Sequence, residues 1–137
     1  MTRWLADTSV SVPAIVENHP AHHSVAAWLR DRPTVLAAHS ALETYSVLTR
    51  LPGDARLTPG DAAAVIAERF GAPSVLPARR ARRLVDELAR LGIAGSAVYD
   101  ALIAVTADAD GRVLVTRDVR AAATYSLMNV THEFLAA

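Results

Sequence analysis

Residues 97–118 read AVYDALIAVTADADGRVLVTRD, and this stretch contains the pattern that decides the fold. Its first part, from about Ala97 to Ala109, is apolar and has the length of a helix. Asp110-Gly111 is a turn signal, and Val113-Leu114-Val115 after it predicts a short buried strand. Helices that alternate with short buried strands in this way indicate an open parallel α/β sheet.

The rest of the chain shows the same alternation. The expected strands are residues 5–6, 34–38, 74–77, 113–115 and 129–131. The expected helices are residues 13–17, 22–30, 41–51, one that starts at Thr58-Pro59, 78–91, 97–109, and one that Asp118 opens. No repeat or linker divides them, so the sequence predicts one α/β domain.

The composition describes a folded protein without thiol chemistry. Of the 137 residues, 52% are hydrophobic and 20% are charged, which argues against disorder. With no Cys, neither a disulfide nor a thiolate metal site can form. An acid at position 7 precedes any signal-peptide core, and no apolar run reaches the ~18 residues that a membrane helix needs. We therefore expect a cytoplasmic protein with no membrane partner.

The charge balance excludes several kinds of chemistry. The chain has 14 basic and 14 acidic residues with a net charge of +0, and every basic residue is Arg. The lack of Lys removes any mechanism that needs a catalytic or phosphate-binding Lys. A neutral chain exerts no long-range attraction on nucleic acid, so any RNA contact must come from a local patch.

Four acids stand where a parallel sheet would gather them. In such a sheet, the carboxyl ends of the strands and the first turns of the intervening helices share one edge, and ligands bind there. Asp7 follows the first expected strand, and Asp118 follows the fourth. Glu43 and Asp100 lie in the first turns of two expected helices. The topology alone therefore predicts that these four carboxylates lie on the same edge.

Each acid also has a purely structural explanation. Ser40 and Glu43 fit a capping box, Asp118 fits an N-cap, Asp100 can complement a helix dipole, and Asp7 can form an Asx turn. Gathered together, however, two carboxylates ~4 Å apart repel by about 4 kcal/mol at an effective dielectric of 20. A divalent cation removes this repulsion, and oxygen ligands without Cys suit Mg²⁺ or Mn²⁺. Phosphodiester hydrolysis is the reaction that such an ion serves best.

Four segments around these acids form a characteristic set. They are Leu5-Ala6-Asp7-Thr8-Ser9, Ser40-Ala41-Leu42-Glu43, Tyr99-Asp100-Ala101-Leu102-Ile103-Ala104 and Val115-Thr116-Arg117-Asp118. In this order and at this spacing they resemble the PIN-domain nucleases, and within them the VapC toxins of bacterial toxin–antitoxin pairs. The resemblance covers essentially the entire chain. It implies a single PIN domain over residues 1–137, built as a Rossmann-like three-layer α/β/α sandwich with a five-stranded parallel sheet.

The resemblance also implies a site, a cofactor and partners. Position by position, Asp7, Glu43, Asp100 and Asp118 would bind Mg²⁺ or Mn²⁺ and cleave RNA by attack of water. A cognate antitoxin would block this site, and the toxin would form a homodimer. Residues that would support the metal shell or meet a phosphate are Ser9, Thr116, Arg117 and Arg120. Near the end, Met128-Asn129 replaces the glycine-containing turn that is more usual in the family.

Other classes of protein fit the sequence less well. A receiver domain and a haloacid-dehalogenase-like phosphatase both want a Lys, and the phosphatase also wants an acid where Ser9 stands. A dinucleotide-binding domain needs a glycine-rich first turn, which Asp7-Thr8-Ser9-Val10 is not. Two alternatives remain open. They are a PIN-like module that binds or assembles without catalysis, and a nuclease that acts on DNA.

Two further clusters have ordinary structural explanations. His19, His22 and His23 imitate a metal site, but Pro20 interrupts any helix that would join them, and we expect no zinc there. The densest basic cluster is Arg79, Arg80, Arg82 and Arg83. It is typical of a solvated helix face, with RNA or an acidic partner as the alternative.

Overall fold

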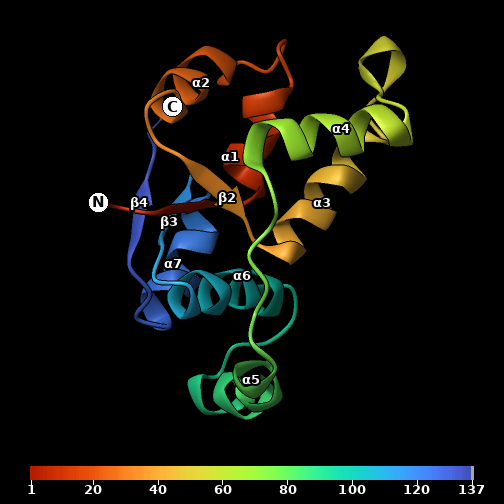
Figure 1. Cartoon of the computed structure of the whole chain (residues 1–137). Coiled ribbons are helices and arrows are strands. Elements are labelled where there is room, and N and C mark those ends of the chain that lie inside the picture. Colours follow the sequence, from red (N-terminus) through yellow and green to blue (C-terminus); the bar gives the residue numbers. More distant parts are fainter. Residues whose placement is uncertain (137) are drawn as a thin grey trace.

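The computed structural model describes residues 1–136, and it has the predicted alternation of strands and helices (Figure 1). The strands are β1 (Trp4–Ala6), β2 (Thr34–Leu36), β3 (Val113–Thr116) and β4 (His132–Phe134). The helices are α1 (Thr8–Ile15), α2 (His22–Leu29), α3 (Ala38–Leu48), the 3-10 helix η1 (Gly53–Ala55), α4 (Pro59–Phe70), α5 (Ala78–Leu91), α6 (Ala97–Ala109) and α7 (Val119–Leu127). Within these described residues, no helix has both the length and the apolar character that crossing a membrane requires.

The strands form one parallel sheet in the order β2-β1-β3-β4. Ala6 of β1 is in register with Leu36 of β2 and with Val115 of β3, so these strands end at the same level. The loops and helix starts that follow them therefore share one edge, as the topological argument requires. The predicted α/β class with a parallel sheet is confirmed.

The predicted number of five strands is wrong, because residues 74–77 do not form a strand. Ser74 makes a single parallel bridge with Ala37, and regular pairing stops there. Pro73 and Pro77 flank this segment, and proline has no amide hydrogen to donate to a ladder. The sheet of the described residues therefore has four strands.

The last strand also lies three residues later than expected, at His132–Phe134. Asn129 precedes it with a φ of 58°, which is the left-handed conformation that favours glycine. Asn tolerates this conformation better than most residues. The turn that departs from the family pattern thus keeps a glycine-like backbone without a glycine.

Two helices begin earlier than the sequence predicts. α1 begins at Thr8, because Asp7 caps it, and Pro13 lies inside the helix instead of opening it. α3 begins at Ala38, so Ser40 is three residues past the N-cap position and is not the cap itself. Both shifts bring the helix starts closer to the strand ends, and hence closer to the acidic edge.

Helices cover both faces of the sheet and make three layers (Figure 1). One core lies between the sheet and α1, α2, α3 and α4, and it contains Ala6, Leu36 and Val115. The other lies under α6 and α7 and contains Leu5 and Leu114, because successive residues of a strand face opposite sides. α5 packs outside α6 through a third apolar cluster (Figure 1).

Candidate active site

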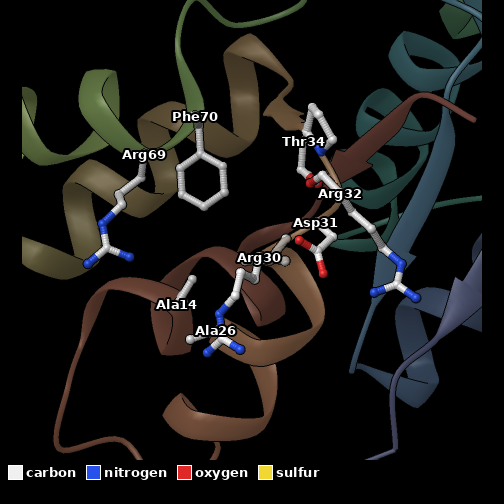
Figure 2. Close-up of a pocket in the computed structure, with 10 residues that line it drawn as sticks. Ala14, Ala26, Arg30, Asp31, Arg32, Thr34, Arg69 and Phe70 are labelled. Atoms are coloured by element: carbon white, nitrogen blue, oxygen red, sulfur yellow. The ribbon is translucent and has the colours of Figure 1, made fainter.

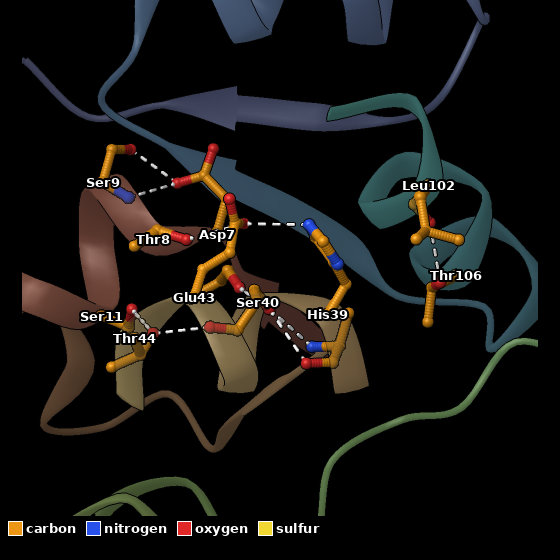
Figure 3. Close-up of polar contacts among 12 residues, drawn as sticks. Asp7, Thr8, Ser9, Ser11, His39, Ser40, Glu43, Thr44, Leu102 and Thr106 are labelled. Atoms are coloured by element: carbon orange, nitrogen blue, oxygen red, sulfur yellow. Dashed lines mark hydrogen bonds and ion pairs between the residues drawn. The ribbon is translucent and has the colours of Figure 1, made fainter. Parts of the chain in front are cut away.

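Asp7 is the most deeply buried of the four acids, with 4% of its surface exposed. Ser9 donates to its Oδ1 from the amide at 3.0 Å and from the hydroxyl at 2.6 Å (Figure 3). The Tyr125 hydroxyl donates to Oδ2 at 2.7 Å. Burial raises the pKa of Asp7, and these hydrogen bonds only partly offset the increase. Since a carboxylate has about four lone-pair positions, Oδ2 keeps one for a further partner.

Ser9 also ties the end of β1 to the end of β3. Its hydroxyl accepts from the Arg117 amide at 2.7 Å and lies 3.2 Å from the Thr116 hydroxyl oxygen. Thr116 in turn accepts from the Asp118 amide at 3.1 Å. These bonds hold the loops that carry Asp7 and Asp118 side by side. The hydroxyls of Ser9 and Thr116, which were both predicted to support the site, lie behind these acids.

Glu43 faces the same edge from the second turn of α3 and not from the first turn as predicted, because the helix begins at Ala38. It accepts from the Thr8 hydroxyl at 3.2 Å, and the His39 Nε2 lies 3.6 Å from its Oε1 (Figure 3). The capping-box explanation for this acid is wrong, because the Ser40 hydroxyl accepts from the Ala37 amide at 2.9 Å without help from Glu43. Glu43 is thereby left for contacts outside its own helix.

Asp118 has the structural role that the sequence offered as an alternative. Its Oδ1 accepts from the Arg120 amide at 2.9 Å and from the Ala121 amide at 3.4 Å, so it is the N-cap of α7. Capping uses only this oxygen within residues 1–136 and leaves Oδ2 available. A structural and a functional role are therefore compatible at Asp118.

Asp100 is the acid with the least support from its surroundings. In the described part of the chain it accepts no hydrogen bond and makes no ion pair. Burial, followed by the charges of Asp118, Asp7 and Glu43, raises the pKa of Asp100 to about 6. Asp100 thus stands close enough to the other three acids for their charges to disfavour its ionised form.

The four acids surround a small hollow of about 140 Å³, together with Thr8, Ser9 and Ile103. An adjoining hollow is lined by Glu43, Asp100 and Asp118, and also by Tyr99, Arg120 and others. Of the two arginines expected near a phosphate, Arg120 lines this second hollow and Arg117 lines neither. The structure thus brings together the four predicted acids and Arg120, with the predicted hydroxyls of Ser9 and Thr116 behind the acids.

The chemistry of these donors fits a hard divalent cation. The acids and the hydroxyls beside them offer only oxygen, which Mg²⁺ and Mn²⁺ prefer. Among the ion pairs of residues 1–136, none involves Asp7, Asp100 or Asp118, so these three carboxylates have no basic side chain within ion-pair distance. Within the same residues, no three His or acidic side chains stand close enough together to form a complete metal cage. An ion that keeps several waters and uses few carboxylates does not need such a cage.

A larger hollow of about 600 Å³ lies away from the acids, and Arg30, Arg32 and Arg69 are among its lining residues. Their guanidinium groups point in different directions (Figure 2). Arg32 is also engaged, because it donates to the Trp28 carbonyl at 2.7 Å and covers the Trp28 ring. The three arginines therefore do not converge on a point where one anion could bind, and this hollow is not a candidate catalytic centre.

The other clusters of the sequence make local contacts. His19 accepts from the Ala21 amide through Nδ1 at 3.0 Å, and the Nδ1 of His22 lies 2.8 Å from the Pro13 carbonyl oxygen. In the basic cluster of α5, Arg80 pairs with Glu87 and with Asp108. These contacts stabilise loops and helix faces and lie apart from the four acids.

Two contacts that shape the site could not be predicted from the sequence. Tyr125 is fully buried and donates to Asp7 across 118 positions of the chain. The rings of His39 and Tyr99 stack on each other, although they come from α3 and α6. Both contacts depend on tertiary packing, and no local pattern at either residue predicts them.

Comparison with known proteins identifies the family of the chain. A family model described as the PIN domain matches residues 5–127, and the chain therefore belongs to the PIN-domain family. It is 49% identical to ribonuclease VapC27 of Mycobacterium tuberculosis over 124 residues, and this aligned region covers 90% of each chain. It is 42% identical over 130 residues to ribonuclease VapC40 of the same species, across 94% of this chain and 96% of that one. The resemblance to VapC proteins is confirmed.

Solved structures show the same architecture. VapBC2 from Rickettsia felis, bound to a DNA fragment from its promoter, matches with a TM-score of 0.70 at 17% identity, over 98% of this chain and 100% of that one. DNA-bound VapBC from Salmonella typhimurium matches with a TM-score of 0.67 at 20% identity, over 98% of both chains. At these identities the likeness establishes the fold alone.

Proposed function

We propose that residues 1–137 form a single PIN domain that works as a metal-dependent endoribonuclease, the toxin of a toxin–antitoxin pair. The observation that carries the proposal is the group of four acids at the sheet edge, three of which have no basic partner in the described residues. The names of the relatives VapC27 and VapC40, both ribonucleases, support RNA as the substrate. We expect this activity in the cytoplasm.

Asp7 and Asp100 would be the central ligands of Mg²⁺ or Mn²⁺, with Glu43 and Asp118 completing the shell directly or through water. The ion supplies a water of lowered pKa and screens the charge that builds up on the phosphate. Ser9 and Tyr125 hold the Asp7 carboxylate in one orientation, so little ordering is left for the moment of binding.

Arg120 provides the positive charge of the site. It lines the hollow beside Asp100 and Asp118, and its charge lowers the pKa of Asp100 against the larger effects that raise it. A phosphate drawn into this hollow would meet the guanidinium of Arg120 on one side and the acids on the other. The side chain is therefore suited to orient the phosphate relative to the carboxylates.

The proposal is tested by RNA cleavage in Mg²⁺ or Mn²⁺ with purified protein free of any antitoxin. The substitutions Asp7→Asn and Asp100→Asn should reduce cleavage at least about 100-fold, because changes even behind the ligands of a metal site cost about 10–100-fold. Asp110→Asn, at the C-cap of the helix that carries Asp100, is the matched control and should cleave normally. Full activity of both site variants would reject the site, and cleavage of DNA in place of RNA would reject the substrate.

A protein partner and a second copy of the chain are part of the same proposal. The structures that share the fold are VapBC assemblies, which supports a cognate antitoxin. The face between α3 and α4 carries an almost wholly apolar hollow, and Leu42 beside it is 68% exposed. This face supports the expected homodimer. Light scattering after size exclusion should give twice the monomer mass, and a monomer at high concentration would reject the dimer.

A further inference from the structure

An aromatic stack stands beside the four acids. The rings of His39 and Tyr99 lie 5.2 Å apart between centroids and only 9° from parallel. His39 is in the first turn of α3, which also carries Glu43, and Tyr99 directly precedes Asp100 at the start of α6. The stack therefore joins the two helices that contribute Glu43 and Asp100 to the acidic edge.

Tyr99 differs from the other tyrosines of the chain in its exposure. Tyr125 is fully buried and Tyr45 packs against the first core, whereas 55% of the surface of Tyr99 is exposed. Tyr99 lines the hollow that Asp100 and Arg120 also line. An aromatic ring with one face on His39 and the rest exposed, next to charged groups, contributes little to the stability of the core.

His39 holds the ring of Tyr99 from behind. The Nε2 of His39 is buried, lies 3.6 Å from the Glu43 Oε1, and has no hydrogen bond in the described part of the chain. Its ring is confined between Tyr99 and Glu43, so Tyr99 is supported on one face before any ligand arrives (Figure 3 shows His39 turned toward Glu43).

We propose that the exposed ring of Tyr99 is a stacking surface for one nucleobase of single-stranded RNA, next to the phosphate that the acids would act on. The proposal rests on the proposed function and names the form of its substrate. Unpaired bases of RNA are bound by stacking on aromatic side chains. A chain with a net charge of +0 exerts no long-range attraction on RNA, so local contacts such as base stacking have to supply more of the affinity.

The first test is the affinity for a short single-stranded RNA of mixed sequence, followed by fluorescence anisotropy. All proteins carry Asp7→Asn, so that cleavage does not consume the probe in Mg²⁺. Adding Tyr99→Ala should weaken binding about tenfold, and Tyr99→Leu should weaken it equally. Tyr99→Trp should bind as well or better. The matched control is Val85→Ala, which changes a 75% exposed side chain on α5 and should have no effect.

A second measurement separates stacking from a merely structural role. One abasic nucleotide is moved along the RNA, and each probe is titrated with the Tyr99 protein and with Tyr99→Ala. At one position, the abasic nucleotide should lower the affinity of the protein with Tyr99 about tenfold. It should not lower the already reduced affinity of Tyr99→Ala, because both changes remove the same contact. The proposal would be overturned if the abasic nucleotide lowered the affinity equally at every position, if Tyr99→Ala bound RNA as tightly as the protein with Tyr99, or if no RNA bound at all.

The outcomes for the stacking surface and for the nuclease are distinguishable. Normal cleavage by the wild type with unchanged RNA affinity in Tyr99→Ala would reject the stacking surface and leave the nuclease intact. Base-dependent RNA binding through Tyr99 without any cleavage by the wild type would retain the surface and reject the nuclease. If Tyr99→Ala weakens only the binding of an antitoxin, the surface belongs to the protein partner and the RNA proposal is wrong.

Discussion

The two ends of α6 carry acids in opposite environments. At the end of the helix, Asp110 accepts from Arg112 at 2.6 Å and from the Ser74 hydroxyl at 2.9 Å, and Arg3 lies 3.3 Å away. The Arg112 and Ser74 hydrogen bonds hold the pKa of Asp110 below its usual value. At the start of the helix, Asp100 has no such partner, and burial together with three other acids raises its pKa to about 6.

The difference shows what each end of the helix is for. The chain can place arginines beside a carboxylate, and at Asp110 it does so. At Asp100 it instead gathers further acids, which lowers stability at neutral pH unless a cation is bound. Such an arrangement is typical of a functional site, whereas the paired acid is typical of structural support.

The largest effect on stability is expected for Tyr125→Phe. The buried Asp7 carboxylate is stabilised by hydroxyl groups, whereas Asp110 is stabilised mainly by arginines. The substitution leaves a buried carboxylate with one donor fewer, and we expect a loss of about 2 kcal/mol in the free energy of unfolding. Urea unfolding at pH 7 measures it. Tyr45→Phe is the matched control, since no hydrogen bond of the Tyr45 hydroxyl is found in residues 1–136, and its effect should stay within about 0.5 kcal/mol. Equal effects of both substitutions would contradict the role of Tyr125.

The next largest effect is expected for Asp110→Asn, which removes the paired end of the comparison. At pH 7 the free energy of unfolding should fall by about 1 kcal/mol, because charge-assisted hydrogen bonds are lost at a group where solvent screens the charges. Since the folded pKa is lowered, this stabilisation is present above about pH 4 and disappears as the pH falls through the folded pKa. Unfolding measured between pH 7 and pH 3 should therefore show the variant converging on the wild type. A constant difference over this range would be inconsistent with the ion pairs as its cause.

Asp100→Asn should have the opposite sign. The folded pKa is raised from 3.8 to about 6, so the penalty for the charge is absent below pH 4 and grows between pH 4 and 6. Above that range the variant should be more stable than the wild type by about 1 kcal/mol, allowing for solvent screening at this half-buried group. Thermal unfolding without divalent ions at pH 4 and pH 8 measures the change. Destabilisation at pH 8 would show that Asp100 supports the fold and would remove the contrast with Asp110.

The smallest effect on stability is expected for Asp118→Asn, which separates capping from charge. Asn and Asp are nearly equal as N-caps, so the free energy of unfolding should change by less than about 0.5 kcal/mol. Asp118→Ala should cost about 1 kcal/mol, because the amides of α7 lose their acceptor. Urea unfolding of the two variants provides the measurement. If Asn is as damaging as Ala, the charge of Asp118 and not its cap supports the helix.

The acidic edge could be predicted from the sequence because it follows from topology. Short apolar strands before Asp7 and Asp118, and helices that carry Glu43 and Asp100 in their first two turns, suffice to place four acids on one edge of a parallel sheet. The structure does bring them together, and their role as metal ligands stays a prediction. The first residues of the helices are predicted less accurately, because only one or two hydrogen bonds determine which residue is the cap. At Ser40 the sequence predicts a capping box with Glu43, whereas the N-cap of α3 is Ala37, three residues earlier.

What the sequence could not show are contacts between elements far apart in the chain. The buried Tyr125 and the stacked His39 and Tyr99 depend on how α3, α6 and α7 pack, and no local signal marks them. The expected strand at residues 74–77 failed for a different, local reason. Its apolar residues have strand character, but the prolines around them allow only one bridge.

The most direct test of the central claim is calorimetric titration of Mn²⁺ into the purified wild type and into Asp7→Asn, Asp100→Asn and Asp110→Asn. If the four acids are a cation site, the wild type and Asp110→Asn should bind Mn²⁺ with the same affinity. Both site variants should bind at least about tenfold more weakly. Unchanged affinity in the site variants, or an equal loss in Asp110→Asn, would contradict the assignment of the acidic edge as the metal site.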